Sequence, residues 1–176
     1  MNHIGISLGN DCNAAMFGVK NNYRKTKADG YKTCVFDLIV SNYKGIAKCI
    51  LEDFNNFTNI TYLKYIENIE EPSKNIIINT HYNFCFNHET PGHADLYLHE
   101  NWAEGKNHFI NNNYKHFIDR FNNRINNFKN YLKDDNNIIT FIIDFKNEPN
   151  PNDDFKELRD AFRLKYPNLL YKIVVV

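Results

Sequence analysis

Apolar and polar stretches alternate along the 176-residue chain in a way that predicts strands and helices in turn. A short apolar run over residues 4–8 leads into small and polar residues, and a helical pattern begins at Cys12. Gly9 permits backbone conformations that other residues avoid, and Asn10 or Asp11 can cap the amide groups of the new helix. This stretch therefore predicts a strand, a tight turn and the start of a helix.

The middle of the chain carries two helical patterns on either side of two short β-favouring runs. Apolar residues recur at three- and four-residue steps over residues 42–57 and 108–133, which predicts a helix in each range. The second helix has a continuous apolar stripe, formed by Ile110, Tyr114, Phe117, Ile118, Phe121, Ile125, Phe128 and Leu132. Residues 74–80 and 82–86 favour strands, and the second run places Tyr82, Phe84 and Phe86 on one face.

The last forty residues read as strand, helix, strand. Residues 137–145 form a nearly continuous apolar run, which suits a central strand covered on both faces. Asp153 or Asp154 can cap a helix that runs to Lys165, and residues 169–176 predict a last buried strand. The alternation implies parallel pairing, so we expect a single α/β domain with a Rossmann-like, mostly parallel sheet and helices on both faces, in three layers. An end in mid-strand leaves open that the natural protein continues past Val176.

Composition and charge narrow the classes of function. Lys plus Arg and Asp plus Glu both number 21, and no block of like charge appears, which argues against nucleic-acid coating or membrane-surface binding. The chain shows no leader-like start and no apolar run of roughly 20 residues, so we expect a cytoplasmic protein. Its four cysteines, at 12, 34, 49 and 85, show no C-x-x-C pairing. We therefore expect reduced thiols, no metal and no cofactor.

Three residues are candidates for chemistry. A thiol in the first helical turn, as at Cys12, meets amide groups and a helix dipole that favour the thiolate, although most free cysteines are simply buried. Asp37 interrupts an apolar run, so its carboxylate is expected at the mouth of a site, in an ion pair or at a helix cap. His88 comes just after a predicted strand end, where side chains of open α/β sheets meet ligands.

Four motifs together resemble the putative papain-like cysteine peptidase family, a domain of bacteria and large double-stranded DNA viruses. They are Ile6-Ser-Leu-Gly-Asn-Asp-Cys12, Phe36-Asp-Leu-Ile-Val-Ser-Asn42, Phe86-Asn-His88 and the segment from Tyr114 to Phe128. The resemblance implies that Cys12, Asp37 and His88 match the family's cysteine, aspartate and histidine. It also implies a link to glycan modification, since such domains are often found beside glycan-synthesis genes. Papain-like enzymes have an antiparallel second half, whereas the periodicity here favours alternating strands and helices.

The leading hypothesis is a thiol-dependent hydrolase or acyl-transfer enzyme. Cys12 attacks a carbonyl carbon, His88 takes and returns the proton, and Asp37 holds the imidazole. Backbone amides after Cys12 stabilise the oxyanion, together with Asn10 or Asn13. We expect a small-molecule, glycan or peptide substrate and no membrane or nucleic-acid partner, and the sequence does not predict an oligomeric state.

Two other hypotheses stay open. The turn over residues 8–12 presents backbone amides that suit a phosphate or a nucleotide sugar, with Arg120 or Arg124 assisting. This turn lacks a full glycine fingerprint for nucleotide binding. Alternatively, the chain is a non-catalytic binding module, such as a virion-associated one, in which Cys12 is inert.

Overall fold

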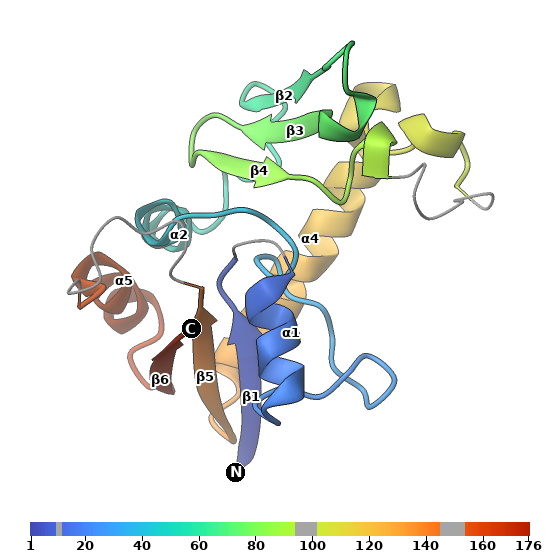
Figure 1. The fold of residues 1–176 in the computed structure, drawn as a ribbon. Coiled ribbons are helices and arrows are strands. Elements are labelled where there is room, and N and C mark those ends of the chain that lie inside the picture. Colours follow the sequence, from blue (N-terminus) through green and yellow to red (C-terminus); the bar gives the residue numbers. More distant parts are fainter. Residues whose placement is uncertain (10–11, 94–101, 145–153) are drawn as a thin grey trace.

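The computed structural model describes residues 1–9, 12–93, 102–144 and 154–176. In these ranges the strands form two sheets of three strands each (Figure 1). The first sheet is parallel and has the order β1 (Asn2–Ser7), β5 (Asn137–Ile143), β6 (Leu170–Val175). The second is antiparallel, with β3 (Ile76–Asn79) between β2 (Leu63–Ile66) and β4 (Phe84–Phe86).

Helices contact both faces of the parallel sheet. They are α1 (Asn13–Lys20), α4 (Asn111–Lys133) and α5 (Lys156–Lys165), whereas α2 (Tyr43–Leu51) packs on α5. Short 3-10 turns lie at Pro72–Lys74 and Gly105–Asn107. A Cβ added at Gly18 of α1 would lie 2.7 Å from Ile142 Cδ1, so the Ile142 side chain of β5 faces α1. Its neighbour Phe141 stacks on Phe162 of α5 at 4.3 Å and lies 6.4 Å from Phe128 of α4. Consecutive strand residues point to opposite faces, so α1 lies on one face and α4 and α5 on the other (Figure 1).

The fold confirms part of the prediction. The chain is a mixed α/β protein, and β5 is the central strand of a parallel sheet, as expected. The Rossmann-like three-layer description is not confirmed, because the parallel sheet has only three strands and residues 63–86 form a separate antiparallel sheet. The prediction of a buried last strand is wrong. β6 is an edge strand, in which Leu170 and Val175 are 50% and 46% exposed.

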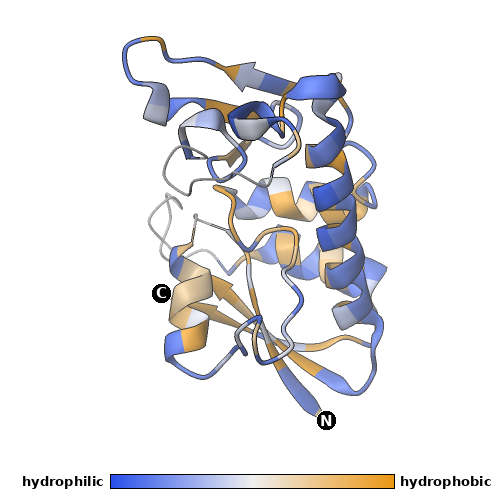
Figure 2. Ribbon diagram, turned by 90° about the vertical axis from the view of Figure 1, so that its right-hand side faces the viewer, coloured by the Kyte–Doolittle hydropathy of each residue, from blue (hydrophilic) through white to orange (hydrophobic). Residues whose placement is uncertain are grey.

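An aromatic face holds the antiparallel sheet against α4. Tyr82, Phe84 and Phe86 are buried together, as their alternation predicted. The Phe86 ring lies 4.9 Å and 5.0 Å from the rings of Phe117 and Phe121 on α4. These two residues belong to the predicted apolar stripe, which is buried at Phe117, Phe121, Ile125, Phe128 and Leu132. Figure 2 shows hydrophobic positions recurring along α4, the long helix, which is otherwise largely hydrophilic.

Phe36 lies at the centre of an aromatic cluster between β4 and α4. Its ring contacts four other rings at centroid distances of 5.4–6.4 Å, those of Phe54, Phe57, Phe84 and Phe128. Nearby, Val40 and Cys85 form an isolated antiparallel bridge with two reciprocal backbone hydrogen bonds of 2.9 Å. The segment that follows Asp37 is therefore tied directly to β4.

Local backbone geometry sets the helix ends. Asn42 caps α2 by accepting a hydrogen bond from the Gly45 amide at 2.6 Å. The helix ends at Leu51, earlier than the predicted residue 57, because Asp53 and Phe54 have positive φ angles of 54° and 66°. Asp154 accepts a hydrogen bond from the Lys156 amide at 3.0 Å, close to the predicted start of α5. Among the described residues, no helix is long and apolar enough to span a membrane.

Candidate functional site

The turn before Cys12 is built around Gly9. Gly9 has a φ of 106°, and its amide donates to Ser7 Oγ at 3.3 Å. A Cβ at this position would overlap the Ser41 hydroxyl, which donates to the Leu8 carbonyl at 2.8 Å. Only glycine fits both the backbone angle and this close approach. Ser41 thereby fixes the carboxyl end of β1 to the segment that follows Asp37.

Cys12 stands at the N-cap position of α1, close to the predicted helix start. Its carbonyl accepts the first helical hydrogen bond, from the Met16 amide at 2.8 Å. The side chain is partly exposed and lines a pocket of about 370 Å³. The other lining residues are Ala15, Met16, Val19, Lys20, Arg24 and Leu38. Asn13, the first residue of α1, is exposed, and the predicted site residue Asn10 lies outside the described residues.

Asp37 is fully buried and forms an ion pair with Arg24. The Arg24 Nη1 atom lies 2.7 Å from Asp37 Oδ1. Asp37 Oδ2 accepts a hydrogen bond from the Cys34 amide at 2.6 Å and one from the Tyr31 hydroxyl at 3.0 Å. Burial raises the pKa of the Asp37 carboxyl, and the Arg24 guanidinium and the two hydrogen bonds oppose that rise. Of the roles expected for this carboxylate, the structure shows the ion pair.

Arg24 connects Asp37 to the Cys12 pocket. The guanidinium carbon lies 4.3 Å from the centroid of the Tyr31 ring, and 11% of the side chain is exposed. The Nε atom is buried and has no hydrogen-bond partner among the described residues. Arg24 therefore brings a fixed positive charge to the wall that Cys12 shares. It was not among the predicted site residues, because residues 23–30 carry only a turn signal and no periodic pattern.

His88 follows β4, as predicted, and contacts a second histidine. Its Nδ1 atom lies 2.9 Å from His93 Nε2, and the two ring centroids are 4.2 Å apart. No hydrogen bond joins His88 to Cys12 or to Asp37 in the described ranges. The structure thus links Asp37 to the Cys12 pocket through Arg24 and pairs His88 with His93, and the catalytic roles of the three residues stay predictions.

Arg120 and Arg124 converge on a buried carboxylate. Arg120 Nε and Arg124 Nη1 lie 3.3 Å and 3.2 Å from the same oxygen, Glu89 Oε1, and Glu89 is 1% exposed. The two arginines line a cavity whose described wall does not include Cys12. The predicted cooperation of these arginines with the turn over residues 8–12 stays a prediction.

A comparison with protein families shows to which family the chain belongs. Residues 4–176, nearly the whole chain, match the family described as "Putative papain-like cysteine peptidase (DUF1796)". The chain belongs to this family. Neither the comparison with curated proteins nor that with solved structures gave a significant match. Membership of the putative papain-like cysteine peptidase family confirms the predicted resemblance, while a viral origin and a link to glycan modification stay predictions.

The four cysteines of this family member differ in surroundings. Cys34 and Cys49 are fully buried, and burial raises the pKa of both thiols well above the usual range. Cys85 is partly exposed, and its Sγ donates to Asn87 Oδ1 at 3.1 Å. Cys12 combines partial exposure, a helix start and a pocket wall. In the described part of the chain, no three His, Cys, Asp or Glu side chains are grouped as metal ligands.

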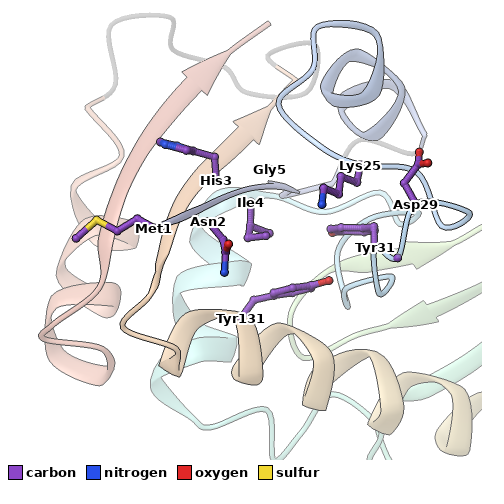
Figure 3. Close-up of a pocket in the computed structure, with 10 residues that line it drawn as sticks. Met1, Asn2, His3, Ile4, Gly5, Lys25, Asp29, Tyr31 and Tyr131 are labelled. Atoms are coloured by element: carbon purple, nitrogen blue, oxygen red, sulfur yellow. The ribbon is translucent and has the colours of Figure 1, made fainter.

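A further pocket, of about 470 Å³, lies beside the start of β1 (Figure 3). Figure 3 shows Ile4 pointing into it toward Tyr31 and Tyr131, whereas His3 points to the other side of the strand. The two tyrosine rings stack at 5.7 Å. Ligands of parallel sheets bind at the carboxyl ends of the strands, and this pocket lies at the amino end of β1. It is therefore separate from the Cys12 site.

Proposed function

We propose that this family member is a thiol-dependent hydrolase or acyl-transfer enzyme with Cys12 as its nucleophile. The position of Cys12, at the start of α1 and in the wall of a pocket, is the observation that carries this proposal. The amides of the first helical turn favour a negative charge there. The thiolate attacks a substrate carbonyl carbon, a carbon–sulfur bond forms, and the leaving group departs with a proton. Water or a second acceptor then releases the acyl group.

His88 is our candidate for the base that moves this proton. Its support is its place directly after β4, together with the bridge that ties β4 to the segment following Asp37. His93, which lies 2.9 Å from the His88 ring, is a better candidate than Asp37 for orienting the imidazole. Asp37 is committed to Arg24 and to the Cys34 amide. In this arrangement Asp37 acts on the site through Arg24.

Arg24 is our candidate for stabilising negative charge in the Cys12 pocket. Its guanidinium is held by the Asp37 carboxylate and by the face of the Tyr31 ring, so it does not need to reorganise during a reaction. Backbone amides of α1 supply further donors, and Asn13 is close enough in sequence to assist. The expected substrate class is a small molecule, glycan or peptide with a reactive carbonyl.

Thiol reactivity tests the proposal. At neutral pH we expect iodoacetamide to alkylate Cys12 faster than Cys34, Cys49 and Cys85, as read by peptide mass spectrometry. Cys12→Ser should remove the fast site and also the hydrolysis of an activated acyl ester. Cys85→Ser is the matched control, because Cys85 is also partly exposed but lies within β4 and not at a helix start. A Cys12 that reacts no faster than Cys85 would favour the non-catalytic binding module instead.

A further inference from the structure

A second cavity, of about 660 Å³, lies between α4 and the segment over residues 27–33. Lys27, Lys32, Arg120 and Arg124 bring four positive charges to its lining. Trp102, His108, Phe109 and His116 contribute aromatic rings, and Thr33, Asn123 and Asn127 complete the wall. None of these residues lines the Cys12 pocket, so the cavity is a separate site.

The positive charges in this cavity, which we call the basic pocket, exceed the negative charge that contacts them. Glu89 is the carboxylate that Arg120 and Arg124 contact, and both reach the same oxygen. Lys27 and Lys32 form no ion pair within the described ranges. Lys27, Arg120 and Arg124 line one pocket and repel one another, and burial together with this repulsion lowers the pKa of Lys27. An anion in the basic pocket would relieve that repulsion.

The two arginines are held in place before any ligand arrives. The guanidinium carbon of Arg120 lies 4.9 Å from the centroid of the Phe109 ring, and that of Arg124 lies 4.9 Å from the Phe121 ring. Glu89, buried behind them, fixes one edge of each guanidinium. The remaining N–H donors have no protein partner in the described part of the chain, which leaves them available for phosphate oxygens.

A stack of flat rings forms another part of the wall. The rings of Trp102 and His108 stack at 5.4 Å with 24° between their planes, and those of His108 and His116 stack at 3.9 Å with 14°. Aromatic rings in the wall of a pocket are typical of sites that bind a planar heterocycle. The volume lies within the range of small-molecule sites, roughly 300–1,000 Å³. A polynucleotide is disfavoured, because the whole chain has no net charge.

We propose that the basic pocket binds an organic phosphate of the nucleoside diphosphate class, with the phosphates held by Lys27, Arg120 and Arg124 and the base beside the aromatic rings that line the pocket. This site does not depend on Cys12. It gives the chain a binding function beyond thiol chemistry, and it places the phosphate at α4 and not at the turn over residues 8–12.

Isothermal titration with UDP, inorganic pyrophosphate and uridine tests the proposal. We expect UDP to bind most tightly, pyrophosphate to bind more weakly and uridine not to bind. Lys27→Ala and Arg120→Gln should each weaken UDP binding about tenfold, since each removes one charge-assisted contact. Arg124 is a poorer target than Arg120, because its side chain is 6% exposed, against 33% for Arg120, so its removal disturbs the core more. Circular dichroism and a thermal melt show whether each variant is folded.

Lys115→Ala is the matched control. Lys115 is an exposed cation on the same helix, 2.6 Å from Asp119, and it does not line the basic pocket. Lys115→Ala and Cys12→Ala should bind UDP as the unchanged chain does, and the second variant separates this proposal from thiol chemistry. Absence of UDP binding, equal binding of uridine, or equal weakening by Lys115→Ala would overturn the proposal. Tighter binding of a single-stranded oligonucleotide than of UDP would also overturn it.

Discussion

The Arg24 guanidinium lies 2.7 Å from the Asp37 carboxylate, and both side chains are nearly or fully buried. The pair joins the segment after α1 to the loop before α2, and Arg24 and Leu38 from these two segments both line the Cys12 pocket. Removing one partner of a buried ion pair leaves the other charge without compensation. The shape of the Cys12 pocket therefore depends on this pair.

The first prediction concerns Asp37. We expect Asp37→Ala to lower the free energy of unfolding by about 3–5 kcal/mol, because it leaves Arg24 and two hydrogen-bond donors buried without their partner. Urea unfolding followed by circular dichroism measures the change. Asp29→Ala is the control, since Asp29 also lies between α1 and α2 but is exposed, and its carboxylate accepts a hydrogen bond from Thr26. Equal stability of the two variants would mean that the ion pair does not hold this region together.

The second prediction concerns pH. Burial favours the protonated form of Glu52, but hydrogen bonds from Asn56, Tyr82 and His81 outweigh it and lower the pKa to about 2, from the usual 4.5. A carboxylate with a lowered pKa in the folded state stabilises the fold above its unfolded pKa. This contribution is present above pH 4.5 and is lost as the pH falls toward 2.

Thermal melts across this pH range test the role of Glu52. We expect Glu52→Gln to melt at a lower temperature than the unchanged chain at neutral pH, and the difference should shrink as the pH falls below 4.5. Glu70→Gln, at an exposed position, should show no such difference. A Glu52→Gln gap that stays constant with pH would show that the effect is steric and not electrostatic.

The third prediction concerns Phe36. Its fully buried ring contacts Phe84 of β4 and Phe128 of α4. We expect Phe36→Ala to cost about 3–5 kcal/mol of unfolding free energy, because it leaves a cavity that these neighbours cannot fill. Denaturant titration measures the loss, and Ile69→Ala, at a residue that is 87% exposed, is the control. A cost below that of Ile69→Ala would refute the role of Phe36 in packing β4 against α4.

The fourth prediction compares two glycines with positive φ. Gly9 has a φ of 106° and lies against Ser41, whereas Gly30 has a φ of 95° with no atom within 4 Å of an added Cβ. Alanine at either position meets the same backbone penalty, on the order of 1 kcal/mol. Gly9→Ala should cost more than Gly30→Ala and should also change the alkylation rate of Cys12, because it displaces the turn before α1. Similar effects of the two variants would show that the Ser41 contact is unimportant.

Local patterns predicted the elements that depend on neighbours in sequence. The apolar stripe on α4 and the apolar run of β5 each lie within one continuous stretch of sequence, so the spacing of apolar residues was sufficient to predict them. The Gly9 turn was also predicted, because its conformational demand is local. The separation of residues 63–86 into their own antiparallel sheet was not, since pairing partners are set by long-range contacts. The exposure of β6 has the same cause, because an apolar run does not tell an edge strand from a central one.

The charged residues around the two pockets were harder to predict. Arg24, Lys27 and Lys32 lie in polar stretches without periodicity, and only the fold brings them to a pocket wall. Arg120 and Arg124 were predicted as candidates for an anion, but Glu89, their buried partner, was not. It lies 35 residues before Arg124, and nothing local marks a glutamate as buried. Buried ion pairs of this kind become visible only when distant segments meet.

The bridge between Val40 and Cys85 connects the strand before His88, the proposed base, to the segment that carries Leu38 of the Cys12 pocket. Its two backbone hydrogen bonds fix the register of β4 against the segment that continues from Asp37 and Leu38. A slip of one residue would turn every side chain of β4 to the opposite face and carry the imidazole with it. The position of the His88 side chain therefore depends on the register of β4, a short strand far from Cys12 in sequence.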